Sequence, residues 1–134
     1  MLSKTARDAV RACLILRGLP KGSHAGADKI SQIIGARPLY LSKILQALSR
    51  RGVLESKKGK GGGFRLGGSP ERITLRDLLG PVERFPGPSE CLFRDRPCPD
   101  NASCRIQCRW RPVRRAFDRF LSQTTLADVA LGRI

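Results

Sequence analysis

The chain has 134 residues, the size of one domain with a core of its own. Its 26 Lys and Arg outnumber its 11 Asp and Glu, and the formal net charge of +15 favours a polyanionic partner, nucleic acid before an anionic membrane surface. The longest apolar stretch is too short to cross a bilayer, and Arg7 and Asp8 lie where a secretory leader would be apolar. We therefore expect a cytoplasmic protein with reduced cysteines.

The first expected element is a helix over residues 3–18, because its apolar residues recur at helical spacing. Ser3 is a candidate N-cap, and Gly18 is a candidate stop. Cys13 should belong to the core, since an unligated cysteine behaves as a small hydrophobic residue. Asp8 lies on the same helix, and we expect its carboxylate to be solvated.

Two more helices are predicted next, joined by a tight turn. The first, over 28–34, should end at Gly35. Its expected buried residues are Ile30, Ile33 and Ile34. The second should begin near Pro38, whose fixed φ suits a first helical turn, and end before Gly52. Its expected apolar face consists of Leu41, Ile44, Leu45 and Leu48.

The stretch "VLESKKGKGGGFRLGG" predicts two short strands around a turn of lysine and glycine. Two helices followed by a hairpin is the order of a winged helix-turn-helix, whose second helix enters the major groove of DNA. This order, combined with the positive charge, favours DNA contact over a merely solvated basic surface. The residues expected to contact DNA are Arg37, Pro38, Leu39, Tyr40, Ser42, Lys43, Lys57, Lys58, Lys60 and Arg65.

A further short helix follows the hairpin, with Thr74 and Asp77 at the spacing of a capping box. Proline, glycine and charge then predict a loop up to Cys108, and a final helix should begin near Arg111 with Pro112 in its first turn. Its apolar stripe consists of Trp110, Val113, Phe117, Phe120, Leu121 and Thr124. A second copy of this helix is the simplest partner that could bury the stripe.

The expected fold is therefore mainly α with a small β-hairpin. We expect a winged helix-turn-helix DNA-binding domain over 1–84, a cysteine-rich loop over 85–108, and a dimerisation helix with a C-terminal tail over 109–134.

Four of the five cysteines gather in this predicted loop: Cys91, Cys98, Cys104 and Cys108. Soft thiolates commonly bind iron-sulfur clusters in sets of four, and the arginines between them would offset a cluster's negative charge. Zinc is the rival ligand, although its structural sites usually use CxxC pairs, which this sequence lacks. Simple redox-active thiols are a third possibility. No nucleophile-base pair or phosphate-binding loop suggests an enzyme or a small-molecule substrate.

Several segments resemble the Rrf2 superfamily of iron-sulfur transcription regulators, typified by IscR, NsrR and RirA. They are "LSKTARDAVRA", "YLSKILQALSRRGVLES", "GKGGGFRL", "ITLRDLL" and "TTLADV", together with three spaced cysteines. The resemblance covers nearly the whole chain. It implies a homodimer of winged DNA-binding domains joined through a long C-terminal helix. It also implies three cluster ligands in each subunit, which map onto Cys91, Cys98 and Cys104.

The fourth ligand varies in this family, and the chain departs from the known patterns. Gln107 stands where some members have a histidine, and Cys108 comes next. Arg7 aligns with an aspartate that some nitric-oxide sensors supply from the partner's first helix, which leaves Asp8 one residue out of register. Cys108 is therefore the leading candidate and Asp8 the second. The RirA-like spacing favours a 4Fe-4S cluster over a 2Fe-2S cluster.

These observations predict a dimeric transcription regulator, a repressor, that binds a palindromic site in double-stranded DNA. Its DNA affinity would be controlled by an iron-sulfur cluster that senses iron, cluster status, redox state or nitric oxide. Cluster ligation would order the loop and fix the dimer helix, and so set the spacing of two recognition helices. The alternatives are a cluster-free cysteine-thiol redox regulator and a zinc-stabilised nucleic-acid-binding module.

Overall fold

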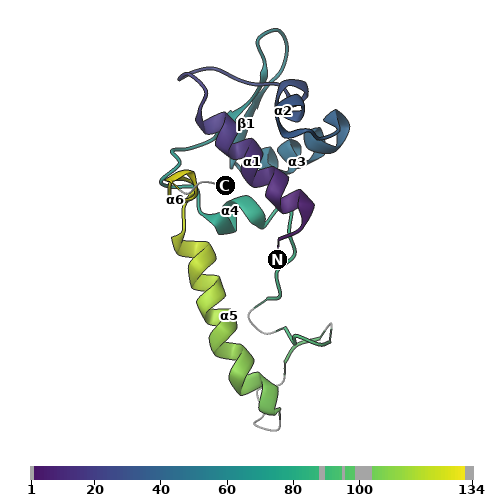
Figure 1. The fold of residues 1–134 in the computed structure, drawn as a ribbon, viewed down its shortest axis with the longest axis vertical. Helices are drawn as coiled ribbons and strands as arrows, with labels where there is room; N and C mark the ends of the chain where they lie inside the picture. The colour runs from purple at the N-terminus through teal and green to yellow at the C-terminus, as the bar shows by residue number, and fades with distance from the viewer. Residues whose placement is uncertain (1, 88–89, 95, 99–103, 132–134) are drawn as a thin grey trace.

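The structure is a computed structural model that describes residues 2–87, 90–94, 96–98 and 104–131 (Figure 1). Its elements are, in chain order, α1 (Lys4–Arg17), α2 (Ala27–Ile34), α3 (Pro38–Arg50), β1 (Leu54–Lys57), β2 (Gly63–Leu66), α4 (Leu75–Leu79), α5 (Arg105–Gln123) and α6 (Leu126–Leu131). The predicted fold class, mainly α with a small hairpin, is confirmed. None of the helices in the described ranges combines the length and apolar composition needed to cross a bilayer.

Helix α1 runs through the centre of the core. The Ser3 hydroxyl accepts a hydrogen bond from the Ala6 amide at 3.1 Å, so the predicted N-cap is confirmed. Cys13 is completely buried, as expected, and burial raises the pKa of its thiol to about 12. The expectation that Asp8 is solvated is wrong, because only 4% of this residue is exposed. Neighbouring cationic and hydroxyl groups make that burial tolerable.

Helices α2 and α3 pack against each other across a short turn, as predicted. Gly35 ends α2 in a left-handed conformation, and Pro38 begins α3. The prediction that Ile33 is buried is wrong, because this residue is 58% exposed. Ile30 and Ile34 lie one turn apart on the face of α2 that packs against the core, and Ile33 lies outside that face.

Strands β1 and β2 form the predicted antiparallel hairpin, in which Leu54 pairs with Leu66. The loop before α2 pairs with β2 through a single antiparallel bridge, because Ala25 and Phe64 exchange two backbone hydrogen bonds of 2.8 and 2.9 Å. Gly63 makes this close approach possible. Its φ is +131°, and a Cβ there would lie 2.5 Å from the carbonyl carbon and oxygen of Ala25.

Helix α4 closes the core beneath α1 and also contacts α5. The capping box is confirmed, because the Thr74 hydroxyl accepts from the Asp77 amide and the Asp77 carboxylate accepts from the Thr74 amide. The buried leucines of this end of the core are Leu75, Leu78, Leu79, Leu121 and Leu126. Since Leu121 belongs to α5 and Leu126 to α6, the C-terminal part of the chain is packed into the same core.

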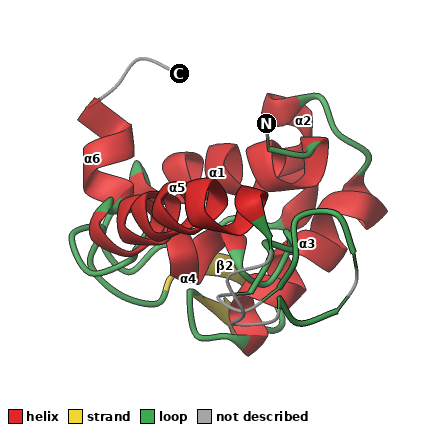
Figure 2. Ribbon diagram, turned by 90° about the horizontal axis from the view of Figure 1, so that it is seen from below, coloured by secondary structure: helices red, strands yellow, loops and turns green. Residues whose placement is uncertain are grey.

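Helix α5 extends away from this core toward the end of the molecule opposite the hairpin (Figure 1), and it lies in front of the other helices when seen from below (Figure 2). It begins at Arg105, so the expected start near Arg111 is wrong. Pro112 lies inside the helix instead of in its first turn, where it removes one backbone hydrogen bond and leaves the helix continuous. Cys108 is consequently a helical residue and not part of the loop.

Candidate functional site

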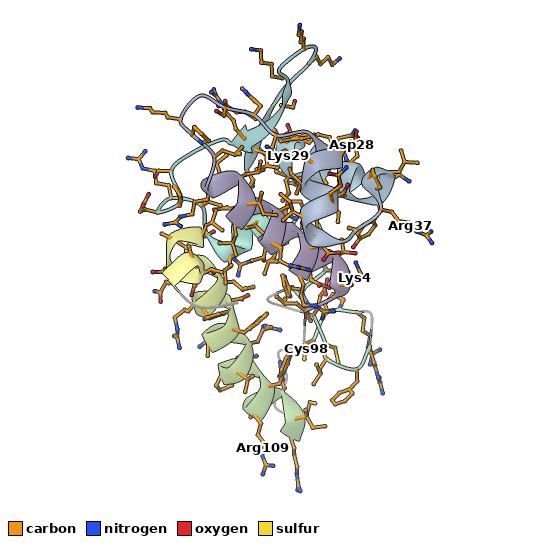
Figure 3. The ribbon with its side chains drawn as sticks, turned by 45° about the horizontal axis from the view of Figure 1, so that its top comes forward. Lys4, Asp28, Lys29, Arg37, Cys98 and Arg109 are labelled. Carbon is orange, nitrogen blue, oxygen red and sulfur yellow. The ribbon has the colours of Figure 1, made fainter. Side chains whose placement is uncertain are left out.

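The N-terminal turn of α3 presents an open surface. Arg37 and Pro38 are exposed, as is Lys43 one turn later, and Leu39 is 82% exposed although it is apolar. Figure 3 shows the Arg37 side chain directed away from the body of the protein. An exposed helix start with a cation and an apolar side chain has the groups that contact phosphates, base edges and thymine methyls in a major groove.

The hairpin tip carries a second group of exposed cations. Lys57, Lys58 and Lys60 are all exposed, and within the described ranges no ion pair joins them to an acid. The tip projects beyond the helices (Figure 1), so these ammonium groups can approach a phosphate backbone. Arg65 differs, because its guanidinium forms an ion pair of 2.6 Å with Glu55 on the opposite strand.

Two of the residues expected to contact DNA, Tyr40 and Ser42, are only partly exposed. Ser42 is half-buried on α3. Tyr40 is half-buried as well, and its hydroxyl lies 3.2 Å from Thr5 Oγ1 and 3.3 Å from Asp8 Oδ2 on α1. Its side chain is therefore directed toward α1, and a direct contact with DNA stays a prediction.

The four clustered cysteines are free thiols at the far end of the molecule. Cys91, Cys98 and Cys104 are half-buried, and Cys108 is exposed. The Cys91 amide donates to the Arg96 carbonyl at 3.1 Å, and Glu90 and Pro97 form a β-bridge, so one small loop positions the first two cysteines. Cys104 is the N-cap of α5, and Cys108 lies one turn further along that helix. Figure 3 shows Cys98 in the half of the molecule opposite the hairpin, between Lys4 and Arg109.

The structure does not bring the predicted ligands together as a finished metal site. In the part of the chain that the structure describes, no group of three or more His, Cys, Asp or Glu side chains could hold a metal ion. Residues 99–103, which connect Cys98 to Cys104, lie outside the described residues. The ligand assignments therefore stay predictions.

Trp110 is a feature of this region that sequence reasoning missed. Its indole Nε1 is buried without a hydrogen-bond partner among the described residues. A buried N–H group normally has an acceptor. Trp110 was expected only as part of the apolar stripe, and no sequence signal distinguishes an indole that lacks an acceptor from one that has it.

The apolar stripe of α5 is only partly used within the subunit. Leu121 is buried in the core, and the Phe117 ring packs edge-on against Phe85 with centroids 5.4 Å apart. The large apolar residues of α5 that stay exposed are Ile106, Val113, Phe117 and Phe120. Such a contiguous apolar face is typical of a protein interface.

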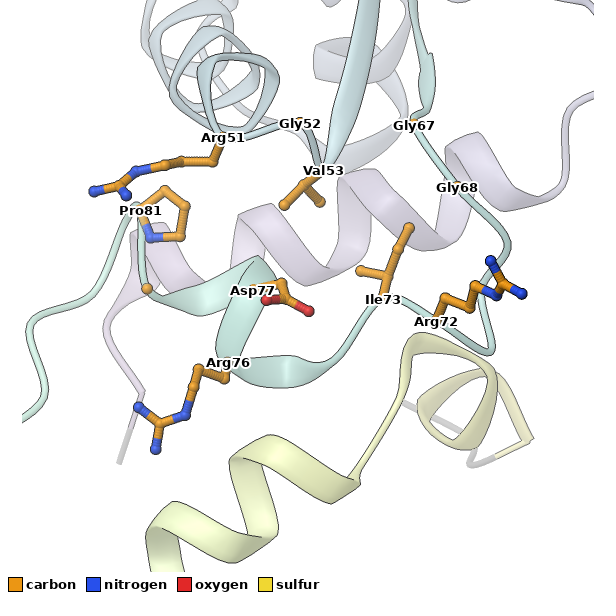
Figure 4. Close-up of a pocket in the computed structure, with 11 residues that line it drawn as sticks. Arg51, Gly52, Val53, Gly67, Gly68, Arg72, Ile73, Arg76, Asp77 and Pro81 are labelled. Carbon is orange, nitrogen blue, oxygen red and sulfur yellow. The ribbon is translucent and has the colours of Figure 1, made fainter.

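The side chain of Arg76 makes polar contacts that join α4 to α5. The Arg76 guanidinium on α4 forms an ion pair of 2.8 Å with Asp118 and donates to Ser122 Oγ at 3.1 Å. The same arginine is at the edge of a cavity of about 490 Å³ between the end of α3, the hairpin and α4 (Figure 4). Its guanidinium points away from the cavity, and Asp77 there is engaged by Thr74, so no convergent set of binding groups is formed.

Comparisons with known proteins agree with this architecture. A family described as "Rrf2: Iron-dependent Transcriptional regulator" matches residues 2–131. Protein rrf2 of Nitratidesulfovibrio vulgaris is 32% identical over 100 residues, which cover 75% of this chain and 67% of that protein. The HTH-type transcriptional regulator NsrR of Shouchella clausii is 27% identical over 92% of this chain and 84% of its own length.

A solved structure extends the comparison to three dimensions. CymR, described as the global cysteine regulator of B. subtilis, is 25% identical and superposes with a TM-score of 0.77, covering 98% of this chain and 96% of that one. The helices and the hairpin thus form the winged helix-turn-helix arrangement of such regulators. The chain belongs to the Rrf2 family of DNA-binding transcriptional regulators.

Proposed function

We propose that this chain is one subunit of a cytoplasmic homodimeric repressor that binds a palindromic operator in double-stranded DNA and whose affinity depends on an iron-sulfur cluster. The observation that carries the proposal is the presence of four free thiols in one short segment, the loop before α5 and the start of α5: Cys91, Cys98, Cys104 and Cys108. The family description, an iron-dependent transcriptional regulator, supports the same role.

DNA binding rests on two surfaces at the other end of the subunit. The exposed start of α3 presents Arg37 and Leu39 to base edges, and the hairpin tip presents Lys58 and its neighbouring lysines to phosphates. Lysines without an acidic partner can neutralise phosphates and release counterions, which the large positive charge of the chain favours.

The exposed face of α5 supports dimerisation. A second copy placed by a two-fold axis would cover Ile106, Val113 and Phe120, which water otherwise surrounds. Leu121 and the contact between Arg76 and Asp118 attach α5 to the DNA-binding half, so the dimer geometry determines the distance between two copies of α3. Two copies of α3 one DNA turn apart would require a palindromic site.

The donor chemistry of the cysteine segment fits an iron-sulfur cluster. Four thiols meet the usual ligand number. The indole N–H of Trp110 has no acceptor among the described residues, and a sulfur atom could provide one. Arg105 and Arg109 are exposed beside these thiols and would offset negative charge. When bound, a cluster supplies a centre that responds to iron supply, redox state or nitric oxide. Because Cys104 occupies the N-cap position of α5, its ligation state would bear directly on the start of the dimer helix.

A thiol-based redox regulator without iron is the second candidate. Cys108 is exposed and lies one helical turn from Cys104, which makes this pair accessible to oxidants.

Iron, acid-labile sulfide and zinc counts on anaerobically purified protein test the cluster. We expect a coloured protein that contains equal amounts of iron and sulfide. The amounts per cluster should be those of a 4Fe-4S cluster. Iron and sulfide should both be lost in Cys91→Ala, Cys98→Ala and Cys104→Ala. Their loss or retention in Cys108→Ala decides whether Cys108 is the fourth ligand. Cys13→Ala is the matched control, because Cys13 is buried far from this segment in the core, and it should keep both. Zinc without sulfide would support the zinc-stabilised module, and metal-free protein with a reversible response to peroxide would support the thiol regulator.

The DNA surfaces are tested by fluorescence anisotropy with a duplex that the native protein selects from a random-sequence library. Lys58→Ala should weaken binding to all duplexes alike and reduce the slope of log affinity against log salt by about 1. Arg37→Ala should instead relax the sequence preference. Arg119→Ala removes an exposed cation on α5 and should change neither quantity. Equal effects of all three variants would contradict the assigned surfaces.

A further inference from the structure

We infer that Asp8 and Tyr40 form a hydrogen-bonded pair that positions the first turn of α3 for sequence-specific DNA binding, so that Asp8 is a positioning residue and not a cluster ligand. The inference rests on the proposed role of α3 as the element that contacts base edges. Asp8 then acts through Tyr40 and touches no DNA itself.

Asp8 is a buried carboxylate with several donors around it. Its side chain is 5% exposed, and Oδ2 accepts a hydrogen bond from the Lys4 ammonium at 2.6 Å. The Arg11 guanidinium lies 3.9 Å from Oδ1, and the Tyr40 hydroxyl lies 3.3 Å from Oδ2. A buried charge is costly unless it is paired and hydrogen-bonded. These contacts therefore hold the carboxylate in place against α3.

Tyr40 makes the connection to α3. Its hydroxyl reaches Asp8 and Thr5, and the Lys4 ammonium lies 5.1 Å from the centroid of its ring. The ring and the hydroxyl of Tyr40 thus both contact the first turns of α1, which restricts the orientation of the side chain. Figure 3 shows Lys4 and Arg37 on the same side of the molecule.

The first turn of α3 is anchored on one side by the buried Leu41, whose amide donates to the Arg37 carbonyl at 3.0 Å, but the residues before Tyr40 add little to this anchor. Arg37 is the N-cap, and its side chain makes no capping hydrogen bond. Pro38 lacks an amide proton, and Leu39 is 82% exposed. Base-edge hydrogen bonds tolerate displacements of only a few tenths of an ångström, so a small shift of this turn would weaken specific contacts. Phosphate contacts made by the distant hairpin would be unaffected.

The same contacts oppose a ligand role for Asp8. If the carboxylate left to bind a partner subunit's cluster, Lys4 and Tyr40 would lose their shared acceptor. Water could replace it at the exposed Lys4 ammonium, whereas the half-buried Tyr40 hydroxyl would keep only its contact with Thr5 and would no longer be held against Asp8. Binding a cluster and holding α3 therefore exclude each other for this one side chain.

Tyr40→Phe and Asp8→Asn test the inference, alone and combined. Tyr40→Phe keeps the ring and removes only the hydroxyl, so the fold should be retained. Affinity is measured by anisotropy for the duplex selected by the native protein and for a shuffled duplex of equal length, at the same salt concentration. We expect each variant to lose about tenfold in affinity for the selected duplex, the order of one mismatched base pair, and less than about twofold for the shuffled one.

The double variant separates positioning from general stability. Tyr40→Phe removes the donor of this hydrogen bond, and Asp8→Asn weakens its acceptor by removing the charge. The combined loss of specificity should therefore match that of Tyr40→Phe alone. Asp77→Asn is the matched control: it removes the charge of the acceptor in the capping box of α4, should lower the melting temperature, and should leave the ratio of the two affinities unchanged. Asp8→Asn should also keep its iron and sulfide.

Three results would overturn the inference: an unchanged affinity ratio in both single variants, fully additive losses, or an equal loss in Asp77→Asn. Loss of iron and sulfide in Asp8→Asn would overturn the exclusion of a ligand role. Failure of the proposed function looks different, because the native protein would then select no sequence from the library, and this inference would fall with it.

Discussion

Replacement of Gly63 by alanine should specifically damage the hairpin that carries the basic tip. Gly63 has a φ of +131°, which side chains rarely adopt. An added Cβ would also lie 2.5 Å from the carbonyl carbon and oxygen of Ala25 and 2.7 Å from the Gly26 nitrogen. The atoms in the way are backbone atoms, which cannot rotate aside as a flexible side chain would.

The loss of stability has two parts. A non-glycine residue in such a conformation costs on the order of 1–3 kcal/mol. Relief of the clash would separate Ala25 from Phe64, whose two backbone hydrogen bonds of 2.8 and 2.9 Å contribute about 0.5–1.5 kcal/mol each. We therefore expect Gly63→Ala to lower the free energy of unfolding by at least about 2 kcal/mol.

Urea unfolding followed by circular dichroism measures this loss, with Gly61→Ala as the matched control. Gly61 has a φ of +72°, but a Cβ there meets nothing within 4 Å. It should cost only the left-handed conformation, about 1 kcal/mol. If Gly63→Ala were no less stable than Gly61→Ala, the close approach of Ala25 would not be the reason for glycine at this position.

Three further predictions concern the core and its connections. Cys13→Ser places a hydroxyl in a fully buried site and should cost about 1–3 kcal/mol in urea unfolding, while the native thiol, whose pKa burial raises to about 12, should resist alkylation until the protein unfolds. Labelling of the folded protein would contradict its core position. Arg76→Ala removes the ion pair with Asp118 and should cost under about 1 kcal/mol, yet reduce the ratio of DNA affinities between iron-loaded and iron-free protein. An unchanged ratio would argue against coupling through α4 and α5. Hydrogen bonds from Ser3 lower the pKa of Glu83, so its stabilising contribution is present above about pH 4.3 and lost as the pH falls through the lower folded value. The melting temperatures of the native protein and Glu83→Gln should therefore converge in acid, and a constant difference down to about pH 2 would refute this.

Local signals in the sequence predicted most of the secondary structure. Ser3 caps α1, Pro38 opens α3, and Thr74 with Asp77 starts α4, because each acts through backbone groups only a few residues away. The hairpin also follows from local composition, although the reason for Gly63 does not. That reason is the approach of Ala25, which is distant in the sequence.

The errors concern residues whose environment depends on distant parts of the chain. Asp8 is buried because Tyr40, from a different helix, closes over it. Ile33 is exposed because the neighbours of α2 cover only one of its faces. Pro112 suggested a later start for α5, whereas the helix tolerates its one missing hydrogen bond and includes Cys108. Periodicity alone contains none of this tertiary information.

The central claim is that the state of the cysteine segment controls DNA affinity, and one measurement tests it directly. The selected duplex is titrated anaerobically with iron-loaded protein and with the same preparation after chelation, at one salt concentration. A coupling of about 1–3 kcal/mol predicts affinities that differ by at least about fivefold. Equal affinities for the iron-loaded and iron-free protein, with both iron and sulfide counted, would contradict the claim.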